Sequence, residues 1–336
     1  MLNIPHPYLL FLGDVTAPGY AKTAFGLRDW ARERCVGEFA LPAGSVSTGL
    51  PTLTPAEAVK RGARSTVIGI ANRGGVLSPD WIPSLVACLE AGLDLVSGMH
   101  ARLAQHPEIK AAAARFGRRL IDVRTPPSDI RIASGDKRSG KRLLTVGTDC
   151  ALGKKYTALT LAREFRRRGV DADFRATGQT GILIAGRGIP MDAVVSDFLA
   201  GAAEMLSPAA PDSHWDVVEG QGSIFHPSYS GVSLGLLHGT QPDVIVVCHE
   251  VGRDHVMGLE SYATPSLPEA IELHLRLARR TNAKARCAGI SLNTATLDAA
   301  AAAHALAEQS ARLNLPVADP MRGGRALDRL VEACLA

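Results

Sequence analysis

The sequence predicts an α/β protein of two domains, each built on a mostly parallel sheet with helices on both faces, and three observations lead to this prediction. At 336 residues the chain is longer than one hydrophobic core usually serves. A hydrophobic content of 46% with only 5% aromatic residues is typical of soluble α/β enzymes. Strand-like and helix-like segments alternate along the chain, as they do in βαβ units. Residues 125–141 interrupt this alternation with Pro, Ser, Gly and charge, so we expect domains at residues 1–130 and 138–336.

The first domain begins with the apolar runs "YLLFLG" and "STVIGIA", which predict buried strands. The stretch between them is rich in Gly, Pro, Ser and Thr and predicts loops. Ser78 before Pro79 predicts the start of a helix that ends near Gly92, after which "LDLVSGMH" returns as strand and loop. Pro107 begins another helix that Gly117 ends, and the strand "RRLIDVR" follows.

The second domain repeats this order with clearer signals, including an alanine-rich tract near residue 300 that favours helix. Strands are predicted at residues 142–146, 170–176, 215–218, 244–248, 286–291 and 315–318. Helices are predicted at residues 154–168, 191–206, 268–281 and 297–313.

The most informative stretch is "LLTVGTDCALGKKYTALTLAREF", residues 143–165. An apolar run, a glycine turn and Gly153-Lys154 precede a helix whose Leu159, Ala162 and Phe165 recur at three-residue steps. In a phosphate-binding loop, backbone N–H groups and a helix N-terminus converge on an anion, and a lysine adds positive charge. The alternative is a tight strand–helix turn with a surface lysine. The predicted cofactor-binding residues are Gly147, Thr148, Asp149, Cys150, Ala151, Leu152, Gly153, Lys154, Lys155 and Tyr156.

Lys155 stands where a nucleotide hydrolase has the Ser or Thr that ligates Mg²⁺. A lysine cannot ligate magnesium, and its charge repels the cation. The loop is similar to the "GTDT-x-x-GK-T" variant of dethiobiotin synthetase-like proteins, yet it lacks the hydroxyl. We therefore expect it to hold a phosphorylated cofactor without breaking its phosphate bonds, as coenzyme A would be held, and we expect no metal.

Chemically active side chains follow two further predicted strands, where open α/β sheets bind ligands. Glu219 and His226, in "VVEGQGSIFHPS", are the leading predictions for a general base and for a substrate contact, with His249 as another catalytic residue. The alternatives are that Glu219 caps a loop, that His226 satisfies a turn, and that Arg253 pairs with Glu250 or Asp254 at the surface. The predicted substrate-binding residues are Gln179, Thr180, Gln221, Ser223, Glu250 and Arg253.

Long motifs over nearly the whole chain resemble one family. They are "AKTAFGLRDW", "GIANRGGVLSPDW", "LVSGMHARL", "GTDCALGK", "ATGQTGILIAG", "VVEGQGSIFHPSYSGVSLGLLHG" and "VVCHEVGR". The family comprises bacterial two-domain proteins labelled as a domain of unknown function, and some members are D-glutamate N-acetyltransferases. The resemblance implies a Rossmann-like N-terminal domain, a P-loop NTPase-like C-terminal domain and acetyl-CoA as acyl donor. It implies acetyl transfer to an acidic amino acid, D-glutamate, in D-amino-acid catabolism; the alternative is an ATP-dependent kinase or ligase of the dethiobiotin synthetase-like type.

Composition argues against several other classes. The net charge of +4 is slight, and the basic residues are not interleaved with aromatics, so we expect no nucleic-acid partner. The six cysteines show neither a CxxC pair nor a zinc spacing, which fits reduced thiols in the cytoplasm. No signal peptide and no membrane-spanning stretch is evident, so we expect a cytoplasmic protein. We also expect a homo-oligomer that acts on a small-molecule substrate.

Overall fold

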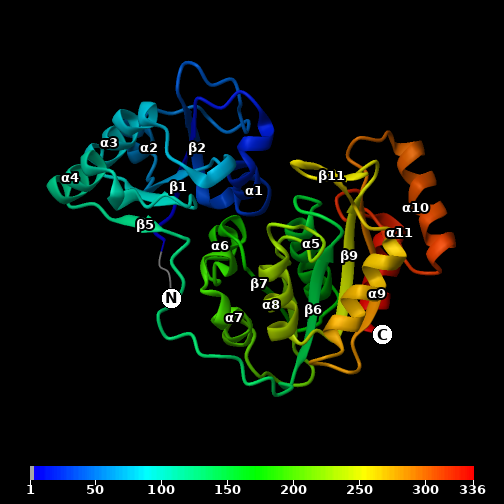
Figure 1. The fold of residues 1–336 in the computed structure, drawn as a ribbon. Coiled ribbons are helices and arrows are strands. Elements are labelled where there is room, and N and C mark those ends of the chain that lie inside the picture. The colour runs from blue at the N-terminus through cyan, green and yellow to red at the C-terminus, as the bar shows by residue number, and fades with distance from the viewer. Residues whose placement is uncertain (1–3) are drawn as a thin grey trace. The chain divides into compact units, whose positions relative to one another are not determined.

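The computed structural model describes residues 4–336, without the side chain of Arg73, and the chain forms two compact units (Figure 1). Unit 1 comprises Met1–Thr125 with Gln179–Pro190, and unit 2 comprises Pro126–Gly178 with Met191–Ala336. The predicted ranges, 1–130 and 138–336, did not anticipate that a segment from the second half of the chain packs with the first.

Unit 1 is built on a five-stranded, fully parallel sheet in the order β2-β1-β3-β4-β5. Its apolar core includes Leu9, Phe11, Leu85 and Leu89, all of which are fully buried. The strands are β1 (Tyr8–Gly13), β2 (Cys35–Ala40), β3 (Ser65–Ile68), β4 (Asp94–Ser97) and β5 (Leu120–Asp122). The helices are α1 (Lys22–Trp30), α2 (Pro55–Lys60), α3 (Ile82–Glu90), α4 (Pro107–Phe116) and α6 (Gln179–Ala185).

The stretch between β1 and β3 was predicted as loops, and this was wrong because it contains α1, β2 and α2. The sequence does contain a helix-start motif for α2, but the Gly, Pro, Ser and Thr content of the stretch led to a loop prediction. Thr54 accepts a hydrogen bond from the backbone N–H of Glu57, whose side chain accepts one from the backbone N–H of Thr54, and Pro55 begins the helix.

Unit 2 is built on a six-stranded, fully parallel sheet in the order β13-β12-β9-β6-β8-β7. Every strand predicted for this half is present, and the predicted 215–218 coincides with β8. The strands are β6 (Lys141–Gly147), β7 (Ala172–Arg175), β8 (Trp215–Val218), β9 (Val244–Glu250), β12 (Arg286–Asn293) and β13 (Val317–Ala318). A separate antiparallel hairpin pairs β10 (His255–Val256) with β11 (Leu259–Ala263).

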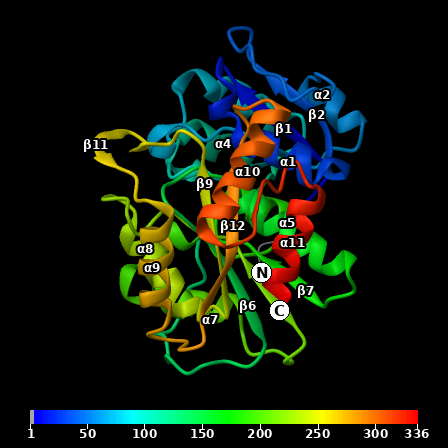
Figure 2. The ribbon, with the colours of Figure 1, turned by 90° about the vertical axis from the view of Figure 1, so that its right-hand side faces the viewer.

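Helices cover both faces of this sheet, as predicted (Figure 2). Helices α5 (Lys154–Arg167) and α11 (Gly324–Leu335) pack together on one face, and α7 (Leu199–Leu206), α8 (Ser230–Thr240) and α9 (Leu267–Ala278) pack in succession on the other. Helix α10 (Ala299–Leu313) packs against β13. Helices α6, α8 and α11 were not predicted, and residues 191–198 of a predicted helix form two 3₁₀ turns before α7. Among the helices of residues 4–336, none has both the length and the apolar character that crossing a bilayer requires.

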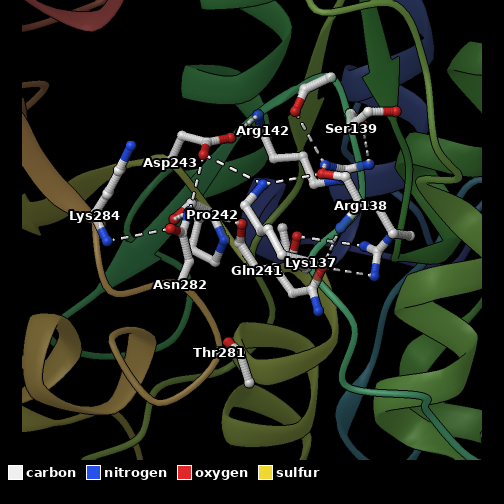
Figure 3. A network of polar contacts seen from close by, with 12 residues as sticks. Lys137, Arg138, Ser139, Arg142, Gln241, Pro242, Asp243, Thr281, Asn282 and Lys284 are labelled. Carbon is white, nitrogen blue, oxygen red and sulfur yellow. Dashed lines mark hydrogen bonds and ion pairs between the residues drawn. The ribbon is translucent and has the colours of Figure 1, made fainter.

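A polar network fixes the start of β6, the strand that leads into the predicted phosphate loop (Figure 3). The side chain of Arg142 is 1% exposed, and its guanidinium donates to the Ser207 hydroxyl and to the carbonyls of Ser139 and Pro208. A carboxylate oxygen of Asp243 accepts the backbone N–H of Arg142 at 2.8 Å. These bonds tie the segment after the predicted domain boundary to the body of unit 2.

Candidate functional site

The predicted phosphate loop lies at the carboxyl end of β6, an inner strand with β8 and β9 as its neighbours, and leads directly into α5. Its backbone has two left-handed residues, Ala151 with φ of 55° and Gly153 with φ of 103°. A non-glycine residue in this region is uncommon and marks a constrained turn. Gly153 takes the position that directly precedes α5, where its lack of a Cβ removes the cost of a positive φ.

Three successive amides of the loop are available to a ligand. Among residues 4–336, no group accepts a hydrogen bond from the backbone N–H of Ala151, Leu152 or Gly153. These amides precede the first turn of a 14-residue helix, whose dipole also favours negative charge. Unpaired amides at a helix start form an anion-binding arrangement.

Lys154 adds a cation to this arrangement. Its side chain is 6% exposed, and its Nζ donates to the backbone carbonyl of Asp149, 2.7 Å away. Burial lowers the pKa of Lys154 below the ordinary value, and the nearby Cys150, Cys248, Asp149 and Glu219 oppose that shift. The ammonium therefore lies beneath the loop, in a poorly solvated place where an anion would interact with it strongly.

Glu219 follows β8 directly and is 5% exposed. Its Oε2 accepts the backbone N–H groups of Thr177 at 3.0 Å and Gly178 at 3.1 Å. Burial raises the pKa of Glu219, whereas the charge of Lys155 and these two hydrogen bonds act to lower it. The Lys155 ammonium thus acts on the carboxylate at the next strand end, and it also lies 4.9 Å from the centre of the Tyr156 ring.

The end of β9 contacts the loop through two side chains. Thr148 Oγ1 lies 2.8 Å from His249 Nδ1, and burial lowers the pKa of His249. Arg253 Nη1 donates to Oδ2 of the fully buried Asp149 at 3.2 Å. Arg253 also forms an ion pair with Glu250, which is the alternative to substrate binding that the sequence left open. Glu250 Oε1 accepts a further hydrogen bond from Asn293.

The side chain of Asp149, which was predicted to bind the cofactor, bonds other residues of the protein. Besides Arg253, its Oδ2 accepts the backbone N–H of Met257 at 2.8 Å, in the turn of the β10–β11 hairpin. Its Oδ1 is buried and has no hydrogen-bond partner among the described residues. Asp149 therefore fastens the hairpin to the loop.

The segment after Glu219 packs against the loop from the other neighbouring strand. Ser223 is 1% exposed and donates to the carbonyl of Gly147 at 2.8 Å, and Gln221 Nε2 donates to Thr177 Oγ1 at 2.9 Å. His226 is 3% exposed, and its Nδ1 accepts the backbone N–H of Ser228 at 3.1 Å. In a neutral ring the proton is then on Nε2, so His226 is a hydrogen-bond donor there and is poorly suited to remove a proton.

Gln179 and Thr180, predicted to bind substrate, lie in unit 1 rather than in unit 2. Thr180 Oγ1 is 3.0 Å from Thr23 Oγ1, and Gln179 Oε1 accepts from Arg124 at 2.9 Å. No sequence signal pointed to these partners, because Thr23 of α1 and Arg124, just after β5, are more than 50 residues away along the chain.

Within the part of the chain that the structure describes, two groups of side chains have the spacing of metal ligands. The ligand atoms of Asp149, Cys150 and His226 lie within 4.8 Å of one another, as do those of Asp173, His214 and Asp216. In the first group the donor chemistry fits a metal poorly, because His226 Nδ1 already accepts a hydrogen bond and the Arg253 guanidinium contacts Asp149. In the second, both ring nitrogens of His214 bind carboxylates, Asp171 and Asp216. The expectation that no metal is required stays a prediction.

The structure adds residues that the sequence did not single out. A pocket of about 460 Å³ lies at the carboxyl ends of β9 and β12, with His249 and Arg253 in its wall. Gln309 and Arg312 of α10 line it too, although nothing in that alanine-rich helix signals a site. Thr177, which bonds Glu219 through both its amide and its hydroxyl, was also missed.

Comparison with known proteins finds relatives over the whole chain. A D-glutamate N-acetyltransferase from Tritonibacter scottomollicae is 50% identical over 99% of both chains, and another from a Pseudoalteromonas species is 45% identical over 96% of this chain and 97% of its own. The crystal structure of a DUF1611 family protein from Anabaena variabilis matches with a TM-score of 0.87 and 33% identity, covering 99% of each chain.

Two family descriptions account for most of the sequence. Residues 33–126 match the Rossmann-like domain of unknown function DUF1611_N, and residues 131–331 match the P-loop domain of unknown function DUF1611_C. Both matches agree with the fold class that the sequence and the resemblance predicted, and with the parallel sheets of the two units. The chain belongs to the DUF1611 family of two-domain proteins.

Proposed function

We propose that this protein is an N-acetyltransferase that moves the acetyl group of acetyl-CoA to the amino group of D-glutamate. The relatives at 50% and 45% identity are named D-glutamate N-acetyltransferase, and both align over at least 96% of either chain. This similarity supports the reaction and the acceptor. The donor, the catabolic role, the cytoplasmic location and a homo-oligomeric assembly stay predictions from the sequence.

The loop at the start of α5 is the observation that supports the donor. Three free amides and the buried Lys154 ammonium suit the pyrophosphate of a coenzyme A. The Ser or Thr that would hold Mg²⁺ for phosphoryl transfer is replaced by Lys155. Acetyl transfer breaks no phosphate bond, so the loop needs only to bind and position the donor.

The reaction balances without a further co-substrate. A base removes a proton from the D-glutamate ammonium, and the amine nitrogen attacks the thioester carbon. The oxyanion that forms then collapses, the C–S bond breaks, and the nitrogen loses its second proton, which balances the proton that the departing thiolate of coenzyme A takes up. The products are N-acetyl-D-glutamate and free coenzyme A, and N–H groups near the loop would stabilise the oxyanion.

The test is a direct assay with the full chain. Acetyl-CoA is incubated with D-glutamate, L-glutamate or D-glutamine, while thiol release is followed by absorbance and the acetylated product by mass spectrometry. We expect stoichiometric thiol and N-acetyl-D-glutamate. Robust magnesium-dependent phosphate release from ATP, stimulated by D-glutamate, with no acetylated product would instead identify a kinase or ligase.

A further inference from the structure

The pocket beside the loop has the composition of a binding site for a small zwitterion. Its volume of about 460 Å³ is within the range of small-molecule sites. Charged groups of both signs line it: Arg253, Asp254, Glu308 and Arg312. It lies at the carboxyl ends of two parallel strands, where open α/β sheets bind ligands.

Three of its charged lining groups lack partners among the described residues. Arg312 is exposed on α10, and no hydrogen bond or ion pair with another described residue involves its guanidinium. The carboxylates of Asp254 and Glu308, also exposed and lining the pocket, likewise make no hydrogen bond or ion pair with another described residue. An arginine and carboxylates that lack protein partners complement the carboxylate and the ammonium of an amino acid.

Arg253 is held differently. Its Nε and Nη2 bind Glu250 and its Nη1 binds Asp149, so two of its five N–H donors stay available. Arg253 follows His249 by four residues and, like His249, contacts the loop, so it lies at the histidine end of the pocket.

His249 is in the position of a base toward this pocket. Its Nδ1 is bonded to Thr148, and when Nδ1 carries the proton, Nε2 has a free lone pair. Burial lowers the pKa of His249; Arg253 and Arg312 add to this shift, while Glu250 and Asp254 oppose it. The ring is therefore neutral at neutral pH, as a general base must be.

We propose that this pocket binds the acceptor amino acid, that Arg312 recognises its side-chain carboxylate, and that His249 Nε2 removes the ammonium proton. This inference rests on the proposed acetyl transfer. The α-carboxylate is one carbon from the reacting nitrogen, so it lies near Arg253 at the histidine end. The distant carboxylate then reaches Arg312, which lines the same pocket from α10, and this makes Arg312 the residue that selects an acidic acceptor.

The first experiment compares Arg312→Gln with Arg329→Gln, a matched change at an exposed arginine of α11 outside the pocket. With acetyl-CoA saturating, we expect Arg312→Gln to raise the KM for D-glutamate roughly 10- to 150-fold, the effect of a lost hydrogen bond to a charged group. The KM for D-glutamine and the Kd for coenzyme A should change little, and the Arg329 variant should match the unmodified protein. An unchanged KM for D-glutamate, or a weaker Kd for coenzyme A in its place, would overturn the assignment.

The second experiment tests the base. His249→Gln should lower kcat by about 10²–10⁴ with the Kd for coenzyme A preserved. In the unmodified protein kcat/KM should fall on the acidic side with a midpoint below 6.5, the ordinary pKa of histidine, because protonation of His249 removes the lone pair. A variant with near-normal kcat and the same acidic limb would exclude His249 as the base.

Calorimetry of D-glutamate in the presence of coenzyme A separates this inference from the proposed function. If the unmodified protein acetylates nothing yet binds D-glutamate, and Arg312→Gln abolishes binding, the pocket assignment stands and the transferase proposal fails. If acetylation occurs but neither variant alters the acceptor's KM or kcat, the transferase proposal stands and the pocket assignment fails.

Discussion

Replacing Lys154 with Met separates ligand binding from folding at the phosphate loop. The substitution keeps an unbranched side chain, one atom shorter, and removes the ammonium of a residue that is 6% exposed; that ammonium lies 2.7 Å from the Asp149 carbonyl. A hydrogen bond to a charged group contributes about 1.5–3 kcal/mol. If Lys154 contacts the coenzyme A pyrophosphate, its loss should therefore weaken binding roughly 10- to 150-fold.

The free energy of unfolding should change much less in Lys154→Met than the affinity for coenzyme A. The Nζ–carbonyl bond is lost, but so is the cost of burying an ammonium, which is the main cause of the lowered pKa of Lys154. The two effects have opposite signs and similar size, so we expect the free energy of unfolding to change by less than about 2 kcal/mol. A variant that binds poorly but unfolds normally would point to a ligand-binding cation rather than a structural one.

The assay is calorimetric titration with coenzyme A and with acetyl-pantetheine, which has the thioester arm but neither the pyrophosphate nor the 3′-phosphate. Lys154→Met should weaken only the binding of coenzyme A. Lys110→Met, the same change at an exposed position of α4, serves as the control and should bind both compounds normally. Unchanged coenzyme A affinity in a folded Lys154→Met variant would refute the assignment of the phosphates to this loop.

Three further changes test other parts of unit 2. Glu219→Gln should lower the melting temperature and change turnover by less than about tenfold, because its carboxylate holds two backbone amides; a fall of 10²–10⁴ would instead make Glu219 the base. Lys155→Thr should gain affinity for Mg²⁺-ATP in calorimetry without becoming a hydrolase, and acetyl transfer by the unmodified protein should survive excess chelator. Arg142→Met should destabilise the protein by about 1–3 kcal/mol in denaturant unfolding, because the buried Ser207 hydroxyl and several partly buried carbonyls lose their donor; a smaller loss would mean that water replaces the guanidinium.

Local signals explain which elements could be predicted from the sequence. The strand–loop–helix around Gly153-Lys154 depends on neighbours in the chain, and both β6 and α5 were placed to within one residue. Helix α8 was missed because its glycines, which are unfavourable in a helix, are there to allow close packing against α7. A Cβ at Gly239 would lie 2.1 Å from the Ala200 carbonyl of α7, and one at Gly235 would lie 2.7 Å from the Leu199 Cβ. Such glycines weaken helix propensity while they allow close helix packing.

The residues of the candidate site likewise fall into those that local sequence predicts and those that depend on the folded structure. Glu219 and His249 were predicted because they come at strand ends, and the structure places both against the loop or its neighbours. The roles of Gln179 and Thr180 could not be predicted, since their partners depend on which unit α6 joins. Arg312 could not be predicted either, because exposed arginines are common on helices and only the structure shows that this one lines a pocket.

Lys155 and Glu219 explain how a phosphate loop can serve a reaction at a thioester. In a nucleotide hydrolase a divalent cation neutralises charge that develops as a phosphate bond breaks. In acetyl transfer the charge develops on the thioester oxygen instead, so the phosphates need only a constant positive environment. If this loop holds the donor, Lys154 and Lys155 would supply that environment from the chain itself, while Lys155 also acts on the buried Glu219 carboxylate. A cation attached to the helix cannot dissociate, so the donor would bind independently of the magnesium concentration.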